Sequence, residues 1–137
     1  MTACVLDASA VIAWALPDEV SLSIERLMDR VMAEGAAAPF FYPAELGNGV
    51  LRAQRRGRLS ESGFGPVRAE LARLPVEIDL DGQSQVWTRA YPLAQTHRLS
   101  LYDALYLELA VRLGLPLATF DGPLRAAATR EGVTLAV

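Results

Sequence analysis

The sequence contains no lysine, and all thirteen of its basic residues are arginine. Enzymes that form a Schiff base on a lysine, and nucleotide-binding proteins with a lysine in their phosphate loop, are therefore excluded. A single cysteine, Cys4, excludes an internal disulfide and a cysteine-based zinc site. No apolar run reaches the roughly 20 residues that span a bilayer, and the N-terminus does not resemble a signal peptide. We therefore expect no membrane association and a cytoplasmic location.

The composition is that of a compact globular protein. The chain has 137 residues, of which 52% are hydrophobic, so we expect residues 1–137 to form a single domain. The net charge of −3 does not indicate a nucleic-acid-binding protein. It does not exclude one either, because clustered acids lower the net charge of a chain that also carries a local patch of arginines. Such a patch is present at Arg52, Arg55, Arg56 and Arg58. It is either a solvated helix face or a surface that contacts nucleic-acid phosphates.

Short apolar runs alternate with segments of helical periodicity, which predicts an α/β fold with a small parallel sheet flanked by helices. Strands are expected at 3–6, 36–40 and 76–80, from Pro116 onward, and at 133–137. Helices are expected at 10–16, from an Asp18 cap to Gly35, at 43–56, from a Ser60 cap to 73, from Asp81 onward, at 101–113 and from Pro123. Pro92 should kink or break the helix that begins near Asp81.

Four carboxylates lie where a predicted strand ends or a predicted helix begins. They are Asp7, Glu45, Asp103 and Asp121. In an open α/β sheet the ligand site forms outside the carboxyl ends of the strands, so these acids can meet in one crevice. Acids gathered in this way repel one another unless a cation joins them, and oxygen ligands suit Mg²⁺ or Mn²⁺. The pattern predicts a metal-dependent site that transfers phosphoryl groups or cleaves phosphodiesters.

Each acid also has a purely structural interpretation. Asp7 could cap the first helix, and Glu45 could stabilise a helix start through the helix dipole. Asp103 could form a capping box with Ser100, and Asp121 could occupy a turn. For Asp103, the helix itself favours function. Its other charged residues are Glu108 and Arg112, which are expected to pair on a solvent-exposed edge of the helix. Glu108 lies about 140° around the helix axis from Asp103, so Asp103 would face a crevice instead.

Three further polar residues are candidates for a supporting role. Ser9 follows Asp7 closely, and Thr119 lies on the same strand face as Asp121. Both hydroxyls could donate to the neighbouring carboxylates. Asn48 lies one helical turn after Glu45 and could orient that side chain or a ligand.

Together these segments resemble the PIN-domain family and, more narrowly, the VapC-type ribonuclease toxins of bacterial toxin–antitoxin systems. The motifs are VLDASA at 5–10, PAE at 43–45, LYDALY at 101–106 and TFD at 119–121. They follow the family's order and cover essentially the whole chain. The resemblance departs from the family at Pro92, in a segment that related proteins usually keep helical.

The resemblance implies a PIN-like three-layer α/β/α fold and a Mg²⁺- or Mn²⁺-dependent endoribonuclease that cleaves structured RNA, such as tRNA or rRNA. It also implies a homodimer and a cognate antitoxin. Asp7 and Asp103 would be the main metal ligands, and Glu45 and Asp121 would complete the acidic site. Two rival interpretations remain open, namely a metal-dependent phosphatase for a small phosphoester and a module that binds RNA or a partner without cleaving.

Overall fold

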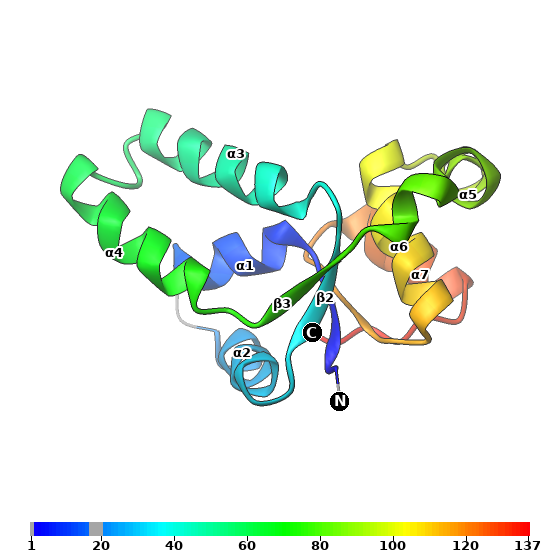
Figure 1. Cartoon of the computed structure of the whole chain (residues 1–137), viewed down its shortest axis with the longest axis horizontal. Helices are drawn as coiled ribbons and strands as arrows, with labels where there is room; N and C mark the ends of the chain where they lie inside the picture. Colours follow the sequence, from blue (N-terminus) through cyan, green and yellow to red (C-terminus); the bar gives the residue numbers. More distant parts are fainter. Residues whose placement is uncertain (1, 17–20) are drawn as a thin grey trace.

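The computed structural model describes residues 2–16 and 21–137, and this part of the chain is built around a parallel sheet (Figure 1). Its strands are β1 (Cys4–Leu6), β2 (Ala36–Pro39), β3 (Val76–Asp79) and β4 (Leu117–Ala118). They are hydrogen-bonded in the order β3-β2-β1-β4, and each neighbouring pair is parallel. The predicted α/β class with a small parallel sheet is confirmed.

Helices cover both faces of the sheet (Figure 1). One layer contains α1 (Ala8–Ala15), α2 (Leu22–Glu34), α3 (Tyr42–Arg55) and α4 (Glu61–Ala72). The other contains α5 (Tyr91–His97), α6 (Leu101–Leu113) and α7 (Gly122–Arg130). Between β3 and α5 the chain forms a 3₁₀ turn, η1 (Asp81–Gln85), and a π turn, η2 (Val86–Ala90). The expected three layers are therefore present. None of the described helices is long and apolar enough to cross a membrane.

The central elements are buried on all sides. All three residues of β1 are buried, because helices pack on both faces of this strand. In α6 the seven consecutive residues 104–110 are buried, which makes it the central helix of its layer. Burial raises the pKa of the Cys4 thiol to about 11, as expected for a core cysteine.

Helices α1 and α3 pack closely beside the end of β1. A β-carbon added to Gly49 would lie 3.0 Å from side-chain atoms of Ile12, so glycine permits this close contact between the two helices. At Gly47 such an atom would meet nothing within 4 Å, so the same argument does not apply there. The α1–α3 contact matters because these helices carry residues of the pocket described below.

Three expectations about secondary structure needed correction or lie outside the described residues. The final strand at 133–137 was wrong, because only Leu135 forms an isolated bridge, to Leu117 of the two-residue β4. The helix from Asp81 is broken into η1, η2 and α5, and Pro92 lies in the first turn of α5. Helix α2 is capped by Ser21, whereas the proposed cap Asp18 lies outside the described residues.

The expected i,i+4 pair of Glu108 and Arg112 on α6 is present, but its expected surface position was wrong. Glu108 is only 3% exposed, because β3 ends beside this part of the helix. Arg112 donates from Nε to Glu108 Oε1 at 2.7 Å and from Nη2 to Asp79 Oδ2 at 2.7 Å. A second bond of 3.1 Å joins Nη1 to Asp79 Oδ1. These three residues form an ion triad that ties α6 to the sheet; we call it the arginine triad.

Candidate active site

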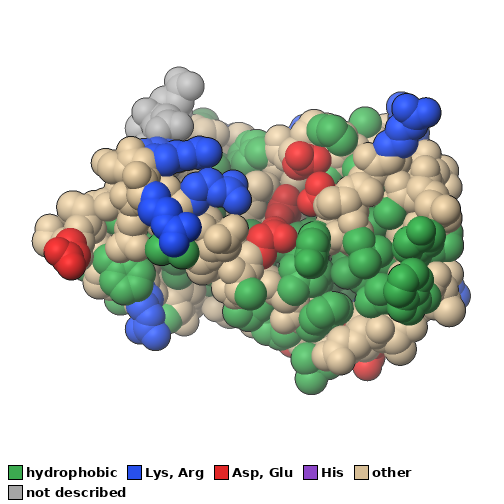
Figure 2. All heavy atoms as spheres, turned by 90° about the horizontal axis from the view of Figure 1, so that it is seen from above, with side chains coloured by type: hydrophobic (Ala, Val, Ile, Leu, Met, Phe, Trp, Pro, Cys, Tyr) green, Lys and Arg blue, Asp and Glu red, His purple; other side chains and the backbone are tan. Residues whose placement is uncertain are grey.

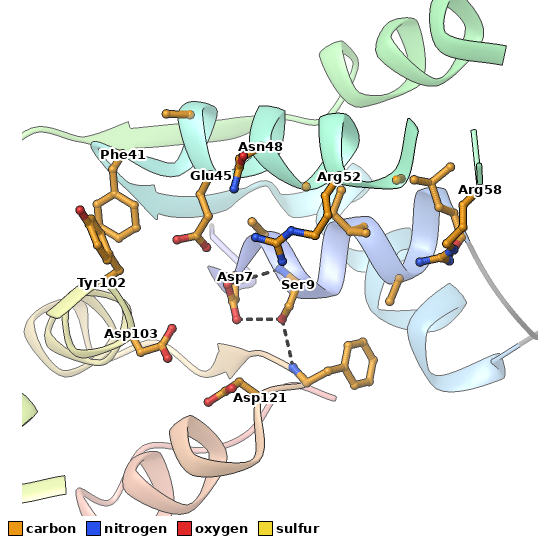
Figure 3. Close-up of a pocket in the computed structure, with 18 of the residues that line it drawn as sticks. Asp7, Ser9, Phe41, Glu45, Asn48, Arg52, Arg58, Tyr102, Asp103 and Asp121 are labelled. Atoms are coloured by element: carbon orange, nitrogen blue, oxygen red, sulfur yellow. Dashed lines mark hydrogen bonds between the residues drawn. The ribbon is translucent and has the colours of Figure 1, made fainter. Parts of the chain in front are cut away.

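The four acids selected from the sequence line one pocket, which we call the acidic pocket (Figure 3). Asp7 directly follows β1, Glu45 lies in the first turn of α3, Asp103 in the first turn of α6, and Asp121 directly precedes α7. Because β1 and β4 are adjacent and parallel, the chain leaves both at the same edge of the sheet. The topology therefore brings these acids together from four separate parts of the sequence.

Asp7 is the most firmly held acid of the pocket. It is 3% exposed, and its Oδ2 accepts hydrogen bonds from Ser9 Oγ at 2.8 Å and from Thr119 Oγ1 at 2.6 Å. Its Oδ1 accepts from the Ser9 backbone N–H at 3.3 Å, which makes Asp7 the N-cap of α1. The capping and site interpretations of Asp7 are thus compatible. The two hydroxyls expected from the sequence to contact carboxylates do so here.

Asp121 and Asp103 are also tied to helix starts. Asp121 caps α7, since its Oδ2 accepts from the Leu124 N–H at 2.9 Å. The backbone N–H of Asp103 donates to Ser100 Oγ at 3.1 Å, so Ser100 caps α6. The side chains of both acids line the pocket. A local structural role therefore does not remove either residue from the site.

Glu45 is held by Tyr106, a residue that was not selected from the sequence as part of the site. Tyr106 donates from Oη to Glu45 Oε1 at 3.1 Å. Its position three residues after Asp103 on a predicted helix was the available signal, because such residues share a helix face. Asn48 lines the same pocket, but within the described part of the chain no hydrogen bond joins it to Glu45.

Burial and mutual repulsion disfavour the charged forms of two acids in the pocket. The pKa of Glu45 is raised to about 7, chiefly by burial and then by the charge of Asp7. The pKa of Asp103 is raised to about 6, again chiefly by burial, and then by the charges of Asp121 and Asp7. No ion pair between described residues includes any of the four acids. The pocket therefore holds negative charge that the described side chains leave uncompensated.

The chemistry of the donor set fits a hard divalent cation. Carboxylate oxygens are the ligands that Mg²⁺ and Mn²⁺ prefer. In the described residues, no three acidic, histidine or cysteine side chains converge closely enough to hold one ion directly. Mg²⁺ commonly takes only one or two carboxylates and keeps several waters, so this spacing suits it better than an ion that requires a complete protein cage.

The pocket continues along α1 and α3 to an end lined by arginines (Figures 2 and 3). Arg52, Arg56 and Arg58 line this end, and we call them the arginine end. Arg58 donates to the Leu16 carbonyl at 2.7 Å. Arg55 does not line the pocket, although the sequence analysis grouped it with Arg52 and Arg56 as a candidate phosphate contact.

Comparisons with known proteins agree with this architecture. A family model described as "PIN domain" matches residues 4–129. The chain is 34% identical over 128 residues to Ribonuclease VapC1 of Mycobacterium tuberculosis, which covers 93% of this chain and 92% of that protein. It is 31% identical over 117 residues to Ribonuclease VapC3 of Pyrobaculum aerophilum, with coverage of 85% and 88%. A crystal structure of a Pyrobaculum aerophilum protein has the same fold, with a TM-score of 0.67 at 24% identity, covering 92% of this chain and 84% of that chain.

Proposed function

Because this chain belongs to the PIN domain family, we propose that it is a metal-dependent endoribonuclease and the toxin of a type II toxin–antitoxin pair, acting in the cytoplasm. We propose further that residues 1–137 work as a single nuclease domain. The observation that carries the proposal is the set of four carboxylates lining one pocket without a cationic partner among the described side chains. The related proteins named as ribonucleases support the choice of RNA.

In this proposal Asp7 and Asp103 hold the principal divalent ion, Mg²⁺ or Mn²⁺, while Glu45 and Asp121 complete the site. When bound, the ion would supply Lewis-acid stabilisation of the charge that develops on the scissile phosphate. The hydrogen bonds from Ser9 and Thr119 fix Oδ2 of Asp7, so this carboxylate needs little reorganisation. The remaining supporting residue is Asn48, whose side chain faces the same pocket.

The arginine end favours a polymeric substrate over a small phosphoester. A rise of 1.5 Å per residue places Arg56 about 16 Å along α3 from Glu45. A small phosphoester held by the acids would not extend over that distance, whereas an RNA strand would place further phosphates beside Arg52 and Arg56. We propose structured RNA, such as tRNA or rRNA, as the substrate. Arg55 is expected to contribute little, since it lies outside the pocket lining.

Cleavage of purified tRNA and rRNA with Mn²⁺ or Mg²⁺ tests the activity. Discrete fragments should appear and should be lost in EDTA. Loss of a residue that only supports a metal ligand costs roughly 10- to 100-fold, so Asp103→Asn should reduce the rate by more than about 100-fold. Asp29→Asn removes an exposed acid from α2 and should leave the rate unchanged.

The outcomes separate the proposed nuclease from its rivals. Wild-type rates from a correctly folded Asp103→Asn protein would reject the assignment of the site. Hydrolysis of a generic phosphoester without RNA cleavage would indicate the phosphatase. Retention of RNA without metal-dependent products would indicate the binding module.

We also propose two protein partners, namely a second copy of the chain and a cognate antitoxin. Leu80, Trp87 and Tyr91 are 66%, 75% and 42% exposed, and the rings of Trp87 and Tyr91 lie 5.3 Å apart. Exposed apolar groups of this size are common at protein interfaces, which supports a homodimer that covers them. Light scattering should then give twice the mass of the chain. For the antitoxin, growth arrest on expression should be relieved when its antitoxin is co-expressed.

A further inference from the structure

Tyr106 is a fully buried residue whose hydroxyl reaches the acidic pocket. It lies on α6, three residues after Asp103, and its side chain is 0% exposed. The ring packs edge-on against Phe41, with centroids 5.4 Å apart and an interplanar angle of 85°. Its Oη donates to Glu45 Oε1 at 3.1 Å and accepts a longer bond from the Ala8 N–H at 3.4 Å. One phenol therefore joins the starts of α1 and α3 to α6.

We propose that Tyr106 is a positioning residue, which holds the Glu45 carboxylate in the orientation that a divalent ion requires. This inference rests on the proposed metal-dependent function. It adds a residue that acts through Glu45 and that contacts neither the metal nor the RNA.

The need for such a residue follows from how the other acids are held. Asp7 and Asp121 are short side chains fixed by helix caps, and hydroxyls also hold Asp7. Glu45 is one methylene longer, is only partly buried, and lies in the first turn of a helix without a side-chain cap. A free glutamate side chain loses rotamer entropy when it is fixed in one orientation. A hydrogen bond from a rigid, buried phenol removes part of that freedom before an ion arrives.

The hydrogen bond is also directional. It uses Oε1 of Glu45, while the carboxyl group of Asp7 in the pocket also interacts with the Glu45 side chain. In Figure 3 the Glu45 side chain extends from α3 toward Asp7 and the interior of the pocket. A bond to one oxygen therefore presents the other to the pocket, as expected for a carboxylate that binds an ion through one oxygen.

Mn²⁺ affinity, measured by isothermal titration calorimetry on metal-free protein without RNA, tests the inference independently of catalysis. Tyr106→Phe keeps the ring and its packing against Phe41 but removes the donor. It should weaken Mn²⁺ binding about fivefold, the net effect of one typical hydrogen bond. Tyr42→Phe is the matched control, because Tyr42 is the other buried tyrosine, and it should change the affinity less than twofold.

A double-mutant cycle shows whether Tyr106 acts through Glu45. In a Glu45→Gln background, Tyr106→Phe should change the remaining Mn²⁺ affinity less than twofold. In RNA cleavage, Tyr106→Phe should lower kcat while KM for RNA stays within twofold. Glu45→Asp gives an independent measurement should Tyr106→Phe fail to fold. It keeps the charge but withdraws the carboxylate from the phenol, and should likewise weaken Mn²⁺ binding at least fivefold.

Wild-type Mn²⁺ affinity in a folded Tyr106→Phe protein would overturn the inference while leaving the proposed nuclease intact. An equal loss in the wild-type and Glu45→Gln backgrounds would also overturn it, because Tyr106 would then have only a structural role. Unchanged Mn²⁺ affinity in Glu45→Asp would do the same. A wild-type protein that neither binds Mn²⁺ nor cleaves RNA would instead overturn the proposed function, and this inference with it.

Discussion

The chain contains two groups of acids, each with a member at the carboxyl end of a parallel strand, and they differ in whether an arginine neutralises them. Asp7 follows β1, and Asp79 is the last residue of β3. Asp79 and the buried Glu108 share Arg112, whereas no ion pair among the described residues reaches the acidic pocket. Position at a strand end therefore identifies an acid as a candidate. The presence of an internal cation decides whether it is structural or available for a ligand.

The two groups also differ in which ionisation state is favoured. Hydrogen bonds from Arg112 hold the pKa of Asp79 below its usual value. In the pocket, burial and neighbouring charges raise the pKa values of Glu45 and Asp103. Folding thus favours the ionised form of Asp79 and the protonated forms of Glu45 and Asp103, as their pKa shifts require. A divalent ion bound in the pocket would favour the ionised carboxylates there, as Arg112 does in the arginine triad.

The largest expected effect comes from removing the cation of the arginine triad. Arg112→Met keeps most of the side-chain packing but leaves Glu108, whose side chain is 3% exposed, without its partner. Breaking a buried ion pair from one side costs 3 to 5 kcal/mol, and the partial exposure of Asp79 places this case near the lower limit. We expect the free energy of unfolding to fall by about 3 kcal/mol, as measured by urea denaturation.

Two controls sharpen that result. Arg68→Met removes an exposed arginine from α4 and should change stability by less than about 0.5 kcal/mol. Saturating Mn²⁺ should stabilise the wild type and Arg112→Met equally and leave the difference between them unchanged, because none of the triad residues lines the pocket. If Arg112→Met were as stable as the wild type, the distinction between the two groups of acids would lose its energetic basis.

For the acidic pocket we expect a smaller change in the free energy of unfolding, with a pH dependence opposite to that of Asp79. The pKa of Glu45 rises from 4.5 to about 7 on folding, and that of Asp103 from 3.8 to about 6. The folded protein therefore binds these protons more tightly than the unfolded chain. The resulting stabilisation is complete below about pH 4 and is lost as the pH rises through 6 and 7. Because solvent screens these half-exposed groups, we expect a loss of about 1 kcal/mol between pH 5 and 8.

Urea denaturation in EDTA across this pH range measures the loss. Glu45→Gln should flatten the profile near pH 7, and saturating Mn²⁺ should restore stability at pH 8. Asp79 provides the internal contrast. Since its pKa is lowered from 3.8, its contribution is present above that value and is lost as the pH falls below it. A flat profile between pH 5 and 8 without metal would show that burial and mutual repulsion do not raise the pKa values of the pocket acids.

Local signals predicted the elements that depend least on distant contacts. The bounds of α6 were predicted correctly at 101–113, because Ser100 caps its start and Gly114 ends it in a left-handed conformation. The strand containing β1 was recognisable as a short, continuous apolar run. The strand at 133–137 failed because a strand needs a partner of adequate length, and β4 has only two residues. The length of β4 cannot be read from residues 133–137 themselves.

In the candidate site too, local sequence signals predicted some features and missed those that depend on distant contacts. The four acids could be selected because strand ends and helix starts are visible in the sequence. The burial of Glu108 could not be foreseen, since it depends on β3 ending beside α6 with Asp79 in reach of Arg112. Likewise, the hydroxyl of Tyr106 contacts a residue 61 positions earlier in the chain. Helical spacing places Tyr106 near Asp103, but only the arrangement of α3 and α6 at the same edge of the sheet brings its hydroxyl to Glu45.

The smallest expected effect concerns Arg52, one of the arginines that line the acidic pocket. Arg52 lines the same pocket as Glu45 but forms no ion pair with any described acid. If Arg52 contacts RNA phosphates, Arg52→Ala should weaken RNA binding about threefold at 0.1 M salt. It should also reduce the number of counterions released on binding, measured from the salt dependence of the affinity, by roughly one. Fluorescence anisotropy with labelled tRNA, in EDTA to prevent cleavage, measures both quantities.

Arg55→Ala is the matched control, because Arg55 lies on the same helix but outside the pocket lining. It should leave RNA affinity within about 1.5-fold at the same salt concentration. Equal losses from both substitutions would indicate a diffuse attraction by α3 as a whole. Unchanged RNA affinity in Arg52→Ala, combined with a loss of stability in EDTA, would have a different meaning. Arg52 would then neutralise the pocket acids within the folded protein, as Arg112 neutralises its own partners. The two groups of acids would differ only in how strongly an arginine neutralises them.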